Sequence, residues 1–122
     1  MTATAARAQL QAAQATALPQ VAVYPLPPMS LAGPSVVIEP DGWVLMNGAQ
    51  VIYRARVHVI HNAPDTTTAL GDLEGMAATS WLATLAAGWS PGDMGGPEAV
   101  TYADQPFMSM TYTAQRLVTL GS

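Results

Sequence analysis

The residues best suited to chemistry gather in one stretch, residues 52–61, which holds both histidines and two of the four arginines. Histidine is a common metal ligand and a frequent general acid or base. The stretch alternates apolar and polar residues, so it predicts a β-strand whose successive side chains point to opposite faces. His58 and His61 are three residues apart and therefore fall on opposite faces. We expect no metal site here.

The same alternation places Arg54, Arg56 and His58 on one face of the predicted strand and apolar residues on the other. A basic face must meet water, an acidic partner or a polyanion. The net charge of −4 argues against a nucleic-acid binder, which needs a basic footprint. The open interpretations are a solvated sheet face and a contact with another subunit or with a polyanion, and we name these three residues as candidate interface residues.

No catalytic constellation accompanies this strand. Asp72 and Glu74 are two residues apart, and on a helix such a pair does not share a face. The glycine-rich residues 92–96 lack the lysine of a phosphate-binding loop. No serine has the flanking glycines of a nucleophile elbow, and the chain has no cysteine. We therefore expect that the protein is not an enzyme and uses no cofactor.

The composition indicates one domain, residues 1–122, with a surface poor in charge. Charged residues make up 10% of the chain and hydrophobic residues 50%, whereas roughly 25% charge is ordinary for a soluble domain. A largely uncharged surface favours self-association. The longest uncharged segment, residues 8–38, is interrupted by five prolines, so we expect no membrane-spanning helix.

The pattern along the chain predicts an α+β fold with a mainly antiparallel sheet of about five strands. We expect an N-terminal helix over residues 1–18, strands and a hairpin over 20–61, a long helix over 65–88 packed on one face, and closing strands over 98–119. The apolar stripe of the first helix is weak, which leaves open whether it packs within its own subunit or against another.

Several local signals refine this outline. Residues 40–42 (Pro-Asp-Gly) predict a turn, and Asn47-Gly48 predicts a hairpin that joins residues 43–46 to 51–54. Residues 89–97 predict a loop, and Asp65 is a suitable N-cap for the long helix. The expected core stripe of this helix follows helical spacing and consists of Leu70, Leu73, Ala77, Trp81 and Leu85.

Two tryptophans and two methionines admit two interpretations each. Trp43 and Trp89 lie in predicted turn or loop positions, where they either cover the sheet edge or contact another subunit, since aromatic residues are enriched at interfaces. We name both as candidate interface residues. Met108 and Met110 lie on one face of a predicted strand, and core packing is favoured over a binding groove.

The order of these segments resembles the tail terminator family of long-tailed bacteriophages, also called tail completion or minor tail proteins. The resemblance rests on the layout of nearly the whole chain. An opening helix leads into LPQVAVYPLPPMSLAGPSVVIEP, a proline-rich region that ends in an apolar strand. The long strand and helix of YRARVHVIHNAPDTTTALGDLEGMAATSWLATL follow, and PEAVTYADQPFMSMTYTAQRLVTL forms the closing strands.

The resemblance implies a structural virion protein that is assembled in the host cytoplasm and located at the head-proximal end of the tail. Copies of the chain would form a homo-oligomeric ring, typically a hexamer, that caps the tail-tube protein, ends its polymerisation and provides the docking surface for neck and connector proteins. DNA would pass through the ring without specific binding. The alternatives are a head–tail connector or stopper protein of the neck and a small ligand-binding or hydrolytic domain.

Overall fold

Two long neighbouring strands, β3 (Gln50–Asn62) and β6 (Gln105–Thr119), pair antiparallel along the whole of β3 and form the middle of the sheet. The computed structural model describes residues 1–62 and 67–120. On one side of this pair, β2 (Ser35–Leu45) joins β3 antiparallel and β1 (Ala22–Tyr24) joins β2 parallel. On the other side, β4 (Ser90–Pro91) and β5 (Gly95–Tyr102) both pair antiparallel with β6.

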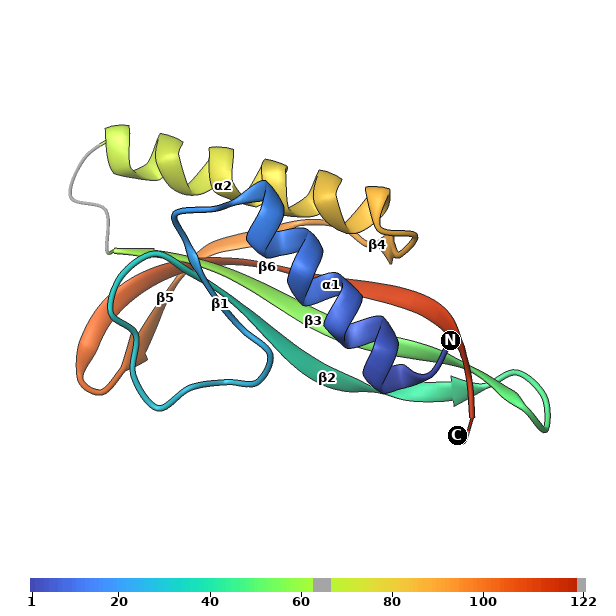
Figure 1. Cartoon of the computed structure of the whole chain (residues 1–122). Coiled ribbons are helices and arrows are strands. Elements are labelled where there is room, and N and C mark those ends of the chain that lie inside the picture. Colours follow the sequence, from blue (N-terminus) through green and yellow to red (C-terminus); the bar gives the residue numbers. More distant parts are fainter. Residues whose placement is uncertain (63–66, 121–122) are drawn as a thin grey trace.

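The two helices, α1 (Ala3–Ala17) and α2 (Thr67–Ala86), lie on the same face of this six-stranded sheet, as Figure 1 shows. The predicted α+β fold with a largely antiparallel sheet is therefore confirmed. The sheet has one strand more than expected because the two-residue β4 joins it. Neither described helix is long and apolar enough to cross a membrane. The predicted N-cap Asp65 lies outside the described residues.

The alternation of β3 determines which face of the sheet becomes the core. Tyr53, Ala55, Val57 and Val59 are buried and belong to the main hydrophobic cluster together with residues of both helices. The residues between them are only partly buried and lie on the face without helices. The predicted separation of the basic residues from the apolar ones is therefore confirmed.

Helix α1 packs on its own subunit, despite its weak apolar stripe. The Thr2 hydroxyl accepts a hydrogen bond from the Ala5 amide and caps the first turn. The buried face of the helix consists of Ala6, Leu10 and Gln14. Ala6 and Leu10 join the main hydrophobic cluster, and Gln14 bonds to Thr84 of α2, so no second subunit is needed to cover this face.

The core stripe of α2 differs from the prediction. Leu73 and Ala77 are buried as expected, but the stripe continues through Ser80 and Thr84. Trp81 is partly buried and packs against the core, but Leu85 is 50% exposed, so the expected core position of Leu85 was wrong. The cause is that the two hydroxyls find polar partners inside the core, which the helical spacing of apolar residues does not reveal.

These partners are Gln14 of α1 and Tyr112 of β6. The Gln14 amide donates to Thr84 Oγ1 at 2.8 Å and its carbonyl accepts from the Ser80 hydroxyl at 2.6 Å. The Tyr112 hydroxyl lies 2.7 Å from Ser80 Oγ and 2.8 Å from Thr84 Oγ1. Burial raises the pKa of Tyr112. Because every member has a partner, the cluster links both helices to the sheet at low desolvation cost.

Arg116 adds a second link between the helices and the sheet. Its Nη1 donates to the Ala87 carbonyl at 2.6 Å and to Gln9 Oε1 at 3.0 Å. A cation at the carbonyl end of a helix is favourable, because that end carries partial negative charge. At Gly88, where φ is +90°, a Cβ would lie 2.9 Å from Arg116 Nη1. Glycine therefore ends the helix and leaves room for the guanidinium.

Two predicted interruptions of the sheet were wrong. Residues 40–42 do not form a turn but an irregularity within β2, whose register with β3 shifts between Pro40 and Trp43. Gly42 has φ of +80°, a conformation that glycine adopts readily in a β-bulge. The predicted loop 89–97 contains β4 and the start of β5, because β6 is long enough to pair with both.

The predicted hairpin at Asn47-Gly48 is confirmed. Trp43 pairs with Tyr53 and Leu45 with Val51. The Asn47 side-chain oxygen accepts hydrogen bonds from the Ala49 and Gln50 amides at 2.9 and 3.0 Å, which fixes the turn. This hairpin extends past the end of the helical layer (Figure 1).

Candidate functional site

The face of the sheet without helices carries a cluster of charged side chains around Arg56. Its Nη2 lies 3.2 Å from Asp41 Oδ1 and its Nη1 lies 3.8 Å from Glu39 Oε1. Glu39 pairs directly with Arg56 on the neighbouring strand, and Asp41 follows two residues later on the same face. The guanidinium is thus paired within its own subunit, and the side chain is 43% exposed. Because two carboxylates already balance its charge, its attraction for an acidic partner is weakened.

His58 lies next to this ion pair and joins β3 to both neighbouring strands. Its Nδ1 is 3.1 Å from Thr111 Oγ1 on β6, and its Nε2 is 3.4 Å from Glu39 Oε2 on β2. Nε2 does not meet the geometry of a hydrogen bond to this carboxylate, so the contact is an ion pair only when the ring is protonated. Burial lowers the pKa of His58, and the nearby Glu39 partly opposes this effect.

Arg54 differs from Arg56 because it has no ion pair within the described residues. Its Nε is buried and has no hydrogen-bond partner in the part of the chain that the structure describes. An unpaired guanidinium can bind a carboxylate of a partner with two parallel hydrogen bonds. Of the predicted basic face, Arg54 is therefore the residue best placed for an acidic partner, and its interface role stays a prediction.

The two candidate tryptophans have opposite environments. Trp89 is 1% exposed, and its ring meets the edge of Tyr53 at a centroid distance of 6.1 Å and an interplanar angle of 73°. Its prediction as a subunit contact was wrong, because the chain turns inward within three residues of the end of α2 and places Trp89 in the core. Trp43 is 57% exposed and remains available to a partner.

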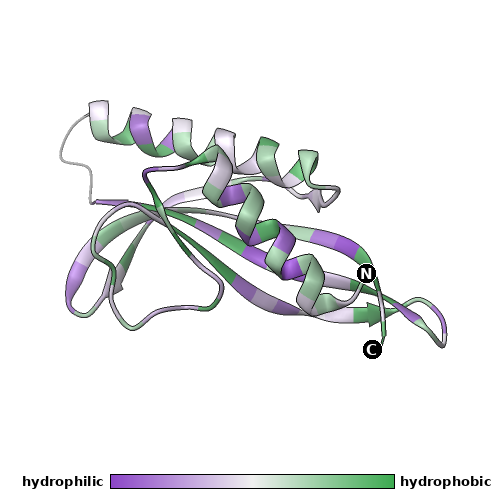
Figure 2. Ribbon diagram, viewed as in Figure 1, coloured by the Kyte–Doolittle hydropathy of each residue, from purple (hydrophilic) through white to green (hydrophobic). Residues whose placement is uncertain are grey.

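Trp43 belongs to an exposed apolar surface at the end of the sheet. We call residues 43–52 the hairpin arm. Trp43, Val44, Leu45 and Met46 are 57, 46, 67 and 56% exposed, and the end of β2 is strongly apolar in Figure 2. Val44 pairs with Ile52, and Ile52 pairs with the exposed Leu117 of β6. Apolar side chains are thus exposed on both faces of the arm, which is typical of an interaction surface.

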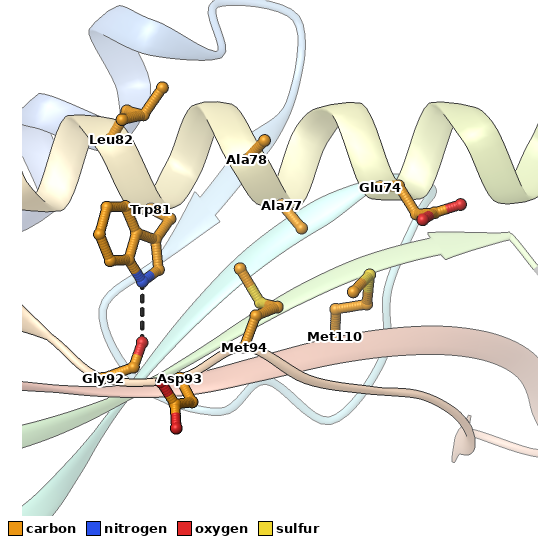
Figure 3. A pocket seen from close by; sticks show the side chains of 9 residues that line it. All are labelled: Glu74, Ala77, Ala78, Trp81, Leu82, Gly92, Asp93, Met94 and Met110. Carbon is orange, nitrogen blue, oxygen red and sulfur yellow. Dashed lines mark hydrogen bonds between the residues drawn. The ribbon is translucent and has the colours of Figure 1, made fainter.

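A second apolar feature is a groove beside α2, which we call the α2 slot (Figure 3). Its volume is about 500 Å³, and its walls come from α2, from residues 92–94 and from β6. The lining residues are Glu74, Ala77, Ala78, Trp81, Leu82, Gly92, Asp93, Met94 and Met110. The Trp81 indole N–H donates to the Gly92 carbonyl at 2.8 Å and closes one end.

The slot was not predicted, because its walls come from three separate segments of the chain. The only related signal was Met110, for which core packing was favoured over a groove. Met110 does pack against the main core, but it also forms part of the slot. Methionine suits both environments because its unbranched thioether side chain adapts to irregular surfaces.

His58 and His61 face opposite sides of β3, as their spacing predicted. Within the described residues, no group of three or more histidine, cysteine, aspartate or glutamate side chains is arranged to hold a metal ion.

Comparison of the sequence with protein-family models found no match, and comparison with curated proteins found none either.

Proposed function

We propose that this protein is a tail terminator, a structural virion protein whose copies form a ring, typically a hexamer, on the end of a bacteriophage tail tube. The ring ends polymerisation of the tail-tube protein and offers a docking surface to neck or connector proteins, while DNA passes through it without specific binding. The proposal is supported by the resemblance in segment order and by the surfaces that a ring-forming subunit requires.

The single observation that carries the proposal is the hairpin arm. Four consecutive large apolar residues, Trp43 to Met46, are each about half exposed or more. In a chain with only 10% charged residues, such an arm is costly to leave in water, at roughly 25 cal/mol per Å² of apolar surface. An arm at one end of a subunit suits a heterologous contact, which produces a closed ring when the rotation between copies closes.

The overall charge of the chain is compatible with DNA passing through the ring. The chain carries a net charge of −4, and Arg56 is paired with Glu39 and Asp41 of its own subunit. Each phosphate that a basic residue neutralises adds affinity for DNA, so a neutral or acidic surface lets DNA slide. This argument supports a conduit and not a DNA-binding role.

The test has two parts. Light scattering with size separation measures the mass of the purified protein, for which we expect a closed oligomer. The protein is then added to polymerising tail-tube subunits, and electron microscopy measures tube length. A terminator shortens the tubes and caps their ends. A protein that leaves the tubes unchanged but binds the head-side connector is instead a connector or stopper of the neck, the alternative that uses the same kind of ring.

A further inference from the structure

The side chains of the hairpin arm that face the helical layer have no cover. Trp43 and Leu45 lie on the same face of the sheet as α1, since they pair with Tyr53 and Val51 of the core face. Trp43 lines two small hollows, one beside the first residues of α1 and one that it shares with Leu45. The arm therefore presents an indole and an isobutyl group, 57 and 67% exposed, at the edge of a helix–sheet sandwich.

The opposite edge of the same sheet carries an apolar groove. The α2 slot opens on the side of α2 away from α1, next to the segment between β4 and β5. Glu74, Ala78, Leu82 and Leu85 follow one helical stripe along this side, and both leucines are at least half exposed. A volume of about 500 Å³ with an apolar lining lies within the usual range of pockets that hold a ligand.

We propose that the hairpin arm of one copy enters the α2 slot of the next copy, with Trp43 and Leu45 beneath the neighbouring α2. This inference rests on the proposed ring and specifies the contact that closes it. The arm and the slot occur on opposite edges of the same sheet and towards the same, helix-bearing face. The arm lies at the level of Val51 and Tyr53 along β3, whereas the slot lies at the level of Val59, which pairs with Met110. Two copies placed edge to edge with their helices on one side therefore bring an arm to a slot when one copy is shifted along the strands.

The backbone favours the same arrangement. Residues 38–45 of β2 lie beyond the short β1 and have no strand partner on their outer edge among the described residues. The outer edge of β5 is likewise unpaired in the part of the chain that the structure describes. Exposed strand edges readily pair with another chain. The arm can thus join the neighbouring sheet while its side chains fill the slot.

The size of the contact favours a closed ring over an isolated dimer. A stable complex buries about 800 Å² per partner, whereas a large aromatic side chain buries only about 150–250 Å². Trp43 and Leu45 alone fall short of this area, so the contact must also include the unpaired strand edges. In a ring, every copy makes two such contacts, one through its arm and one through its slot.

The test uses one variant for each surface. Trp43→Glu introduces a charge into the arm, and Ala78→Arg places a long side chain across the slot, where Glu74 one turn earlier can pair with it. Each variant alone should need an about tenfold or higher concentration to oligomerise. A mixture of both should form a dimer, because the intact arm of the second variant fits the intact slot of the first.

Matched controls repeat the same substitutions elsewhere. Met29→Glu changes an apolar residue that is 94% exposed in the loop between β1 and β2, and Ala86→Arg changes an exposed alanine that lines the groove between α1 and α2. Both controls should assemble like the unmodified protein. Circular dichroism and thermal unfolding check that all four variants are folded.

A cross-linking experiment detects the contact even when one arm–slot pair is weak. The chain has no cysteine, so Leu45→Cys and Ala78→Cys are unique reaction sites. A short bismaleimide should join the two variants only when they are mixed. Cross-linking of Leu45→Cys with itself would overturn the inference in favour of an arm-to-arm contact.

The remaining outcomes separate this inference from the proposed function. If Ala78→Arg assembles normally, or if no cross-link forms in the mixture, the arm–slot contact is wrong even when the protein caps tail tubes. If Ala78→Arg forms the ring but no longer caps tubes, the slot binds the tail-tube protein and the inference also fails. If the contact is found but tubes keep growing, the inference stands and the tail terminator function fails.

Discussion

The two ends of the β2–β3 pair have similar residues and opposite environments. At one end, Val36 and Ile38 of β2 and Val57 and Val59 of β3 are almost fully buried. At the other end, the equally apolar Trp43 to Met46 are about half exposed or more. The difference is the cover above the sheet, since the helices extend over the first end and stop before the second. Apolar strand residues therefore indicate a buried surface but not whether the same subunit buries it.

The largest expected effect is on the free energy of unfolding, and it should distinguish the buried end of β2 from its exposed end. Ile38→Ala should lower the free energy of unfolding by about 2–5 kcal/mol, because it leaves a cavity in the core. Leu45→Ala should change the same quantity by less than about 0.5 kcal/mol in the monomer. Denaturant unfolding at low protein concentration measures both. Equal losses would mean that the hairpin arm is covered within the subunit.

A smaller effect is expected at the buried polar cluster beneath the helices. Gln14→Ala removes a partner from both Ser80 and Thr84, so it should cost about 1–3 kcal/mol of unfolding free energy. Gln11→Ala, on the same helix and only partly buried, is the matched control and should be nearly neutral. A neutral result at Gln14 would show that the hydroxyls find other partners.

The basic face should matter more for assembly than for folding. Arg54→Glu combined with Arg56→Glu should weaken assembly clearly, measured by light scattering. The unfolding free energy should fall by about 1 kcal/mol or less, because ion pairs at partly exposed positions are weak and are screened by salt. Unchanged assembly and unchanged docking to tails would remove this face from the interface.

The smallest effect concerns pH. The pKa of His58 is lowered from 6.5 by burial, so the unfolded chain binds a proton more readily than the folded chain. The stabilisation is present above about pH 6.5 and is lost as the pH falls through the lower pKa of the folded state. The pH dependence of unfolding should therefore be weaker in His58→Asn than in the unmodified protein between pH 7 and 5. Identical profiles would contradict the burial of His58.

Much of the fold could be predicted, because the apolar residues recur at every second position in the strands and at helical spacing in the helices. The strand over residues 52–61, the hairpin at Asn47-Gly48 and both helices all follow such signals. The prediction failed where a long-range partner overrides a local signal. Pro40 and Gly42 indicate a turn by themselves, but pairing of β2 with β3 on both sides makes them an irregularity in one strand. Residues 89–97 became partly extended for the same reason.

The candidate site was predictable only in part. The shared face of Arg54, Arg56 and His58 follows from alternation alone. The exposure of Trp43 and the burial of Trp89 do not, because both residues have similar local contexts and differ only in what lies above them. The ion pair of Arg56 with Asp41 depends on the register in which β2 pairs with β3, and the α2 slot depends on three separate segments.

The sequence by itself determined both helices, the long strands, the two faces of β3 and the low content of charged residues, because alternation and helical spacing follow directly from the order of residues. Only the tertiary structure decided which apolar residues are core and which are left for a partner. The reason is that burial depends on the position and length of the covering helices. Helices α1 and α2 cover Val57 and Val59 but not Trp43 and Leu45.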